Sequence, residues 1–253
     1  MRVVAFVSVC GGVGKTSLVS ALAVLLARRG LSVVAMELDP QNVLGTFLGL
    51  AQPPVTGFAV RMLEGGNPWR NSTYRDADGV IFVPFGNLDV DGLLDFENRL
   101  AANPDWLATH VGQIDLPDSG FVLLDAARFP GMLAAQAIRC ADQVVCVTRP
   151  EPLACAALAR FADALDRASR RFGILANGVH PAHPLHYDVL ALLRARLGDG
   201  LLMALRVHED MSIPESYARG RHCFDEHPQS QAAHDLHELA NLLCASAMPG
   251  GAA

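Results

Sequence analysis

Residues 3–17 of the chain are Val3-Val4-Ala5-Phe6-Val7-Ser8-Val9-Cys10-Gly11-Gly12-Val13-Gly14-Lys15-Thr16-Ser17. The apolar run 3–9 has the length of a buried strand, and residues 17–29 carry leucines at the spacing of a helix. A strand, a glycine-rich turn ending in Lys-Thr and a helix form the phosphate-binding loop of many nucleotide-binding proteins. Backbone N–H groups and the helix N-terminus bind phosphate oxygens there. The sequence therefore predicts a nucleoside triphosphate site in preference to an ordinary strand–helix turn.

Lys15 is the only lysine in the 253-residue chain, in which every other Lys or Arg position holds arginine. A slim, flexible ammonium enters a tight phosphate-binding turn, whereas the planar guanidinium of arginine does not fit in the same way. We therefore expect Lys15 to neutralise phosphate charge and to act in catalysis. The predicted nucleotide-binding residues of the loop are Gly11, Gly12, Val13, Gly14, Lys15, Thr16 and Ser17. Thr16 is also a predicted Mg²⁺ ligand.

Asp125 directly follows the apolar run 121–124. Four apolar residues followed by aspartate, downstream of a phosphate loop, match the Walker B pattern, which places a carboxylate beside Mg²⁺ opposite Thr16. The predicted ligands are therefore ATP or ADP together with Mg²⁺.

Apolar runs of strand length alternate with amphipathic stretches along the chain. The expected strands are residues 3–9, 31–38, 80–84, 121–124, 143–148, 172–176 and 201–207. This alternation predicts an α/β fold with a mostly parallel, doubly wound sheet and helices on both faces. We expect one domain over residues 1–247 and a disordered tail over 248–253. Residues 52–78 are expected to form an irregular surface excursion and residues 103–118 a loop-rich connection.

Composition narrows the class of partner and the compartment. A formal net charge of −6 argues against a protein that coats nucleic acid. The chain has no apolar run near the ~20 residues that a membrane-spanning helix needs and no visible secretory signal. Its six cysteines are dispersed without metal-binding spacing. We therefore expect a cytoplasmic protein with reduced cysteines and no direct membrane insertion.

The Gly-Gly-x-Gly-Lys-Thr form of residues 11–16 resembles the deviant Walker A loop of the MinD/ParA ATPases. This resemblance implies a homodimer formed around ATP. In that family the residue before the first glycine is usually a second lysine, which reaches the partner's phosphates; here it is Cys10. Any such charge must come from an arginine or be absent, so we expect slow hydrolysis. The alternatives for Cys10 are a small, buried apolar side chain and a redox role, and the first is favoured.

Residues 37–42 resemble the switch I segment of the same family. The resemblance implies that Asp39 orients the attacking water and that Glu37 lies near the water shell of Mg²⁺. The alternative for Asp39 is an N-cap of a helix over 41–48. Residues 125–131 resemble switch II but lack its threonine, which points to a slow ATPase or to one that only binds nucleotide.

Two further residues are expected at the nucleotide. Asn177 matches the asparagine that binds the adenine edge in the MinD/ParA family, while a turn-forming asparagine before Gly178 is the alternative. Val207, near the end of the last predicted strand, is the second expected nucleotide contact.

The segments Leu205–Asp210, Ile213–Ser216 and Phe224–Ala233 resemble the C-terminal region of the cellulose biosynthesis proteins of the BcsQ family, and Val83–Gly86 also fits it. This resemblance implies a nucleotide-switched assembly or regulatory factor for cellulose synthesis and secretion. Its expected partners are cytosolic or inner-membrane components of the secretion system, through which it is recruited to that membrane. The alternative is a ParA-like positioning ATPase whose dimer binds DNA, although nucleic acid is a disfavoured partner.

Overall fold

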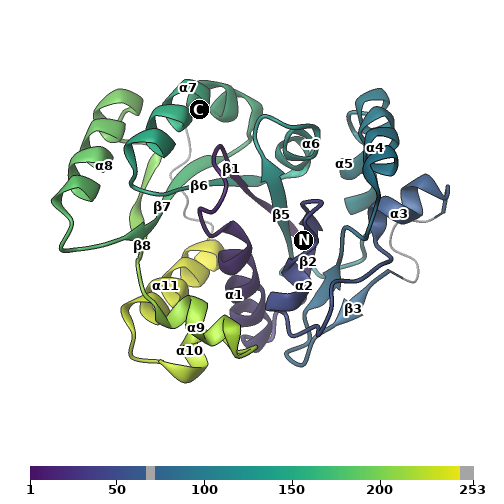
Figure 1. The fold of residues 1–253 in the computed structure, drawn as a ribbon, viewed down its shortest axis with the longest axis horizontal. Coiled ribbons are helices and arrows are strands. Elements are labelled where there is room, and N and C mark those ends of the chain that lie inside the picture. The colour runs from purple at the N-terminus through teal and green to yellow at the C-terminus, as the bar shows by residue number, and fades with distance from the viewer. Residues whose placement is uncertain (67–71, 246–253) are drawn as a thin grey trace.

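A sheet of eight strands runs through the described residues, 1–66 and 72–245 of this computed structural model (Figure 1). The strand order is β3-β4-β2-β5-β1-β6-β7-β8, and all neighbouring pairs are parallel except β3 and β4. The strands are β1 Arg2–Ser8, β2 Val33–Leu38, β3 Tyr74–Arg75, β4 Ile81–Val83, β5 Phe121–Arg128, β6 Gln143–Thr148, β7 Phe172–Val179 and β8 Leu202–His208. The predicted α/β fold is confirmed.

Helices cover both faces of the sheet because its central strands are apolar on both faces. In β1, Val3, Ala5 and Val7 pack into one hydrophobic core, while Val4 and Phe6 pack into another on the opposite face. The helices are α1 Lys15–Arg28, α2 Leu44–Phe47, α3 Phe58–Leu63, α4 Val90–Ala102, α5 Trp106–Val111, α6 Met132–Cys140, α7 Pro152–Ala168, α8 Pro184–Leu197, α9 Ser212–Ala218, α10 Cys223–Glu226 and α11 Gln231–Ala245.

The two cores divide the helices between the two faces. Residues of α3 to α8 contribute to the first core, and residues of α1, α2, α10 and α11 contribute to the second. Figure 1 shows α1 beside α11 on one side of the sheet. Among the described helices, none is both long and apolar enough to cross a bilayer.

The position of β1 decides where a ligand binds. β1 lies between β5 and β6, so the chain turns to one side of β1 for β2 and to the other side for β6. In open parallel sheets, ligands bind outside the carboxyl ends of the strands at such a switch point. The glycine-rich loop after β1 occupies this place.

Two strands are longer than the sequence predicted. β5 continues past Asp125 to Arg128, because its end pairs with the end of β1: Arg128 lies opposite Ser8, and Phe129 N–H donates to the Ser8 carbonyl at 2.8 Å. β7 continues through Asn177 to Val179 and pairs there with β8. In both cases the neighbouring strand extends the ladder beyond the apolar run.

Three helical or loop predictions were also wrong in detail. The helix expected over 41–48 is only the four-residue α2. The connection 103–118 contains α5, whose Trp106, Leu107 and Val111 are buried in the first core. The irregular segment 52–78 contains α3 and the edge strand β3. The tail predicted for 248–253 lies outside the described residues.

Candidate nucleotide-binding site

The loop after β1 has the backbone of a phosphate cradle. Gly12 and Gly14 adopt left-handed φ angles of 70° and 87°, which side chains disfavour. A Cβ on Gly14 would lie 2.4 Å from Nδ2 of Asn177. Gly14 is the N-cap of α1, no side chain caps the helix, and its first turn contains no acidic residue. The first N–H groups of α1 are thus left for an anion.

Lys15 begins α1 and is the one cation held inside the loop. Lys15 is buried, with 8% of its surface exposed. No carboxylate in the described part of the chain forms an ion pair with its ammonium. Its charge favours the charged form of neighbouring Asp125, and an anion held by the loop would compensate further for the cost of burying the ammonium.

Glu37 is a fully buried carboxylate at the end of β2. Its Oε1 accepts the N–H groups of Val43 and, at 2.8 Å, Leu44. Burial raises the pKa of Glu37 to about 8, and repulsion from Asp125 and Asp39 adds to the shift. Glu37 thus holds the start of α2 through one oxygen and leaves the other, Oε2, without a hydrogen bond.

Asp125 faces Glu37 across the β2–β5 ladder. It is 1% exposed, and neither carboxylate oxygen has a hydrogen bond in the described residues. Burial raises the pKa of Asp125 to about 6, while the neighbouring Thr16 hydroxyl and Lys15 ammonium favour its charged form. Asp125 and Thr16, two of the residues predicted at the Mg²⁺ site, therefore lie beside each other.

These oxygens fit Mg²⁺, the metal that the fold class implies. Mg²⁺ takes six oxygen ligands, of which proteins commonly supply one or two and a nucleotide's phosphates and water the rest. Three buried oxygens of Glu37 and Asp125 lack partners, and Thr16 lies beside them. Across residues 1–66 and 72–245, no group of three or more His, Cys, Asp or Glu forms a complete metal site. The donor set is thus suited to a metal that arrives with phosphate.

Asp39 lies just beyond β2 at the same edge. Its Oδ1 accepts the Gln41 N–H at 3.0 Å, which closes a local turn. The alternative that Asp39 caps a helix is wrong: α2 begins only at Leu44, and Glu37 accepts the N–H groups there. A partly exposed carboxylate remains beside the phosphate loop.

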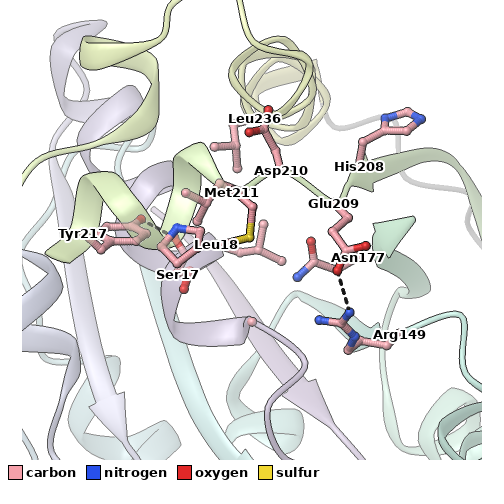
Figure 2. A pocket seen from close by; sticks show the side chains of 14 residues that line it. Ser17, Leu18, Arg149, Asn177, His208, Glu209, Asp210, Met211, Tyr217 and Leu236 are labelled. Carbon is pink, nitrogen blue, oxygen red and sulfur yellow. Dashed lines mark hydrogen bonds and ion pairs between the residues drawn. The ribbon is translucent and has the colours of Figure 1, made fainter. Parts of the chain in front are cut away.

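A pocket opens on the other side of the loop, between α1, the ends of β7 and β8, and α9 (Figure 2). Its volume is about 260 Å³. It is lined by Gly14, Ser17, Leu18, Arg149, Asn177, Gly178, His208, Glu209, Asp210, Met211, Ile213, Pro214, Tyr217 and Leu236. Leucine, isoleucine and proline side chains provide apolar walls, and amide and carboxylate groups lie among them.

Asn177 joins this pocket to the phosphate loop. Its Nδ2 donates to the Val13 carbonyl at 2.6 Å. Asn177 lies within β7, and the left-handed φ of 72° belongs to Gly178. The turn-forming alternative for Asn177 is therefore wrong. Its Oδ1 makes no hydrogen bond with the rest of the described chain and remains as an acceptor at the pocket.

Val207 does not contribute a side chain to the pocket. It is fully buried in the second core and is not among the residues that line the pocket. The next residue, His208, lines the pocket and is held by Asp235, which accepts the His208 N–H and contacts its ring Nδ1, both at 2.8 Å. Successive side chains of a strand point to opposite faces, and in β8 this turns the Val207 side chain into the core. The residues after Val207, and not Val207 itself, line the pocket where the nucleotide contact was predicted.

Sequence reasoning missed three polar residues of the pocket. Arg149 lies against Gly178, and its Nη2 donates to Glu209 at 3.3 Å (Figure 2). Tyr217 donates its hydroxyl to the Ser17 carbonyl at 2.8 Å, which ties α9 to α1. Arg149 and Glu209 directly follow the ends of β6 and β8, so the rule that ligands bind beyond strand ends could have found them.

Cys10 precedes the loop and is only partly buried, where it packs against the second core. Its carbonyl accepts the Ser8 hydroxyl at 2.8 Å. All six cysteines of the chain are free. Cys10 is therefore less buried than the sequence predicted, and no cysteine is bonded to it.

The strand order, the glycine loop at the switch point and the paired carboxylates define a P-loop ATPase fold of the MinD/ParA type. The septum site-determining protein MinD of Pyrococcus horikoshii, solved with Mg-ADP, superposes with a TM-score of 0.75 at 21% identity, covering 96% of this chain and 95% of that one.

A sequence model of the family described as cellulose biosynthesis protein BcsQ matches residues 1–244, and the chain belongs to this family. The BcsQ protein of Salmonella typhimurium is 25% identical over 249 residues, which cover 95% of this chain and 93% of the relative. The chromosome-partitioning ATPase Soj of Thermus thermophilus is 27% identical over an alignment of 262 positions, which covers 97% of this chain and 96% of the relative.

Proposed function

We propose that this protein binds ATP with Mg²⁺, dimerises around the nucleotide, hydrolyses it slowly and thereby switches the assembly or activity of a cellulose synthesis and secretion system. The main support for nucleotide binding is the arrangement of charged groups around the loop. The buried, unpaired ammonium of Lys15 and the uncapped N-terminus of α1 lie beside the unpartnered carboxylate oxygens of Asp125 and Glu37. The first pair of groups requires an anion and the second a cation.

The two sides of the loop have different roles in this proposal. The phosphates lie on the loop 11–17, with Lys15 neutralising their charge and Thr16 and Asp125 beside the metal. When bound, Mg²⁺ neutralises charge on the phosphate oxygens. The base lies in the pocket of Figure 2, where the free Oδ1 of Asn177 is an acceptor for the amino group of adenine.

Hydrolysis needs a positioned water more than covalent help. Asp39 is the partly exposed carboxylate beyond β2, and we assign it to orienting that water. The water oxygen attacks the terminal phosphorus, the bond to the bridging oxygen breaks, ADP and phosphate leave, and the proton lost by the water passes to the solvent. Cys10 brings no charge to this reaction, which is the reason to expect slow turnover.

Nucleotide titration of the wild type, Lys15→Ala and Arg139→Ala tests the binding proposal. Arg139 is an exposed arginine of α6 that pairs with Asp105 and lines neither cavity beside the loop, so it serves as the matched control. We expect binding in the wild type and the control and its loss in Lys15→Ala. Light scattering with ATP, with ADP and without nucleotide tests the dimer. Equal mass in all three states would contradict the switch.

The cellulose role rests on the family to which the chain belongs. We place the protein in the cytoplasm, where cytosolic or inner-membrane components of the secretion system recruit it. Deletion of the coding sequence in its source organism should abolish cellulose output, and the wild-type chain should restore it, whereas Lys15→Ala should not. Unchanged cellulose in the deletion strain would reject this role.

A DNA-positioning ATPase is the second candidate, because Soj covers almost the whole chain at 27% identity. The net charge of −6 opposes it. Retention on non-specific DNA with ATP, weakening as salt rises, would support it. No retention at low salt would leave the secretion role as the better account.

A further inference from the structure

Arg128 lies beside the phosphate loop of its own chain. It is the last residue of β5, opposite Ser8 in the ladder between β1 and β5. A Cβ placed on Gly11 would lie 3.7 Å from Cδ of Arg128, which is ordinary van der Waals contact. The pairing of the two strand ends therefore places Arg128 beside the first glycine of the loop.

The charge of Arg128 is not used within the described chain. Arg128 is exposed, and its guanidinium makes no hydrogen bond or ion pair with residues 1–66 or 72–245. Some exposed arginines have carboxylate partners, such as Arg99 with Asp95 and Arg139 with Asp105, whereas Arg128, like the exposed Arg167 and Arg196, has none in the described residues. An arginine held against the loop but left unpaired is available to a bound anion.

Arg128 also lines a polar cavity on the side of the loop away from the base pocket. The cavity has a volume of about 460 Å³, and Asp39, Gln41 and Glu97 line it together with Arg128. The same cavity is therefore lined by Arg128 and by Asp39, the carboxylate assigned to orienting the attacking water. Lys15 and Asn177 are not among the residues that line this cavity.

Three acidic side chains, Glu37, Asp39 and Asp125, lie in or just beyond β2 and β5 near this loop, and Lys15 is the only lysine in the chain. Arginine presents a rigid fork of N–H donors that matches phosphate oxygens. Arg128 lies beside the loop and has no partner in the described residues. It is therefore suited to contact the terminal phosphate.

We propose that Arg128 is a catalytic residue that contacts the terminal phosphate held by its own P-loop and stabilises the charge that develops during hydrolysis. This inference rests on the proposed function. Arg128 neither takes nor gives a proton, because arginine stays charged in proteins. The attacking water and the departing ADP are those of the hydrolysis already described, and the arginine supplies positive charge to the site of its own chain.

The test compares Arg128→Ala and Arg128→Lys with wild type and with the control Arg139→Ala. We expect Arg128→Ala to lower the hydrolysis rate about 100-fold, the effect of removing one donor to a transition-state oxyanion. Arg128→Lys, which keeps the charge but not the fork, should recover part of this loss. The melting temperature without nucleotide should not change, because no ion pair is removed.

Affinity supplies a second readout that a structural role would not move. Arg128→Ala should weaken binding of a non-hydrolysable ATP analogue at least tenfold and leave ADP affinity within about twofold, because ADP lacks the terminal phosphate. Equal affinities and an unchanged rate in Arg128→Ala would overturn the role of Arg128 alone. Failure of the wild type to bind ATP would instead overturn the proposed function, and this inference with it.

Mixing two inactive variants tests whether the arginine acts on its own site. Asp39→Ala retains Arg128 but lacks the water-orienting carboxylate, and Arg128→Ala has the reverse defect. If Arg128 acts within its own chain, no mixed dimer contains an intact site and activity stays low. Restored hydrolysis on mixing would show that Arg128 serves the partner's phosphates and would overturn the assignment.

Discussion

Glu37 and Asp125 lie opposite each other on the neighbouring strands β2 and β5, both essentially buried, with three of their four carboxylate oxygens unpartnered. Two buried acids in register destabilise each other when both are charged. The fold therefore holds an arrangement that a cation would relieve. This pair explains why metal and nucleotide are expected to bind together. It also explains why the stability of the protein without these ligands should depend on pH.

Lys15→Ala should abolish ATP binding. The substitution removes the only lysine of the chain from the loop, and phosphate charge is then left without its buried counterion. Calorimetric titration with ATP measures the effect, and the fold is checked by circular dichroism. Retained affinity in a folded Lys15→Ala protein would reject the phosphate-loop assignment.

Gly14→Ala should destabilise the protein more than Gly30→Ala does. Both glycines have left-handed φ angles, 87° and 79°, so both substitutions carry a backbone cost of about 1–2 kcal/mol. Only at Gly14 does the added Cβ overlap Asn177, whereas nothing lies within 4 Å at Gly30. Chemical denaturation should show the larger loss for Gly14→Ala, together with weaker nucleotide binding. Equal losses would mean that Asn177 moves aside freely.

Without metal and nucleotide, the protein should lose stability as the pH rises toward 8. The folded pKa of Glu37, about 8, lies above the ordinary value of 4.5, so between these values the folded state binds a proton that the unfolded state has lost. The stabilisation is complete below the ordinary pKa and falls by roughly 1 kcal/mol per pH unit as the pH rises to the folded pKa. Asp125 adds the same trend up to about pH 6.

Glu37→Gln isolates this effect, because glutamine keeps an oxygen for the N–H groups of Val43 and Leu44 without a charge. Urea unfolding at pH 6 and pH 8 in the presence of a chelator should show a smaller difference in this variant than in wild type. The same slope in both proteins would mean that Glu37 is not the group that titrates.

Asp39→Ala should leave ATP binding intact, stop hydrolysis and trap the ATP-bound dimer. In the structure its carboxylate closes one turn at Gln41 and does not hold a helix, so the loss of stability should be about 1 kcal/mol or less. Hydrolysis rate, melting temperature and mass with ATP are measured on one preparation. Normal turnover per folded molecule would reject the role of Asp39.

Cys10→Lys should accelerate hydrolysis, because it adds a positive charge at the start of the loop, where the wild type has only a small apolar side chain. Cys10→Ser is the control, since it changes the polarity but not the charge. The two variants are compared by phosphate release at saturating ATP. A rate in Cys10→Lys at or below that of wild type would contradict the charge deficit proposed for this site.

The phosphate loop and the class of the fold were predictable because both depend on short stretches of chain. The apolar run before Cys10 and the glycines up to Gly14 belong to one continuous segment, whose spacing reports strand, turn and helix directly. Asp125 was singled out for the same reason, since it follows an apolar run. The lengths of β5 and β7 were not, because pairing with β1 and β8 extends both strands past their apolar residues.

By itself, therefore, the sequence determined an α/β chain with a phosphate loop at Lys15 and a carboxylate at Asp125. Only the tertiary structure decided that Glu37, and not Asp39, receives the N–H groups of α2, and that Arg128 lies unpaired against Gly11. Only the tertiary structure also turned Val207 into the core. These relationships depend on the register of strands that are distant in the sequence. A shift of one residue in that register would exchange the faces to which the side chains point, and the order of the residues along the chain does not contain that register locally.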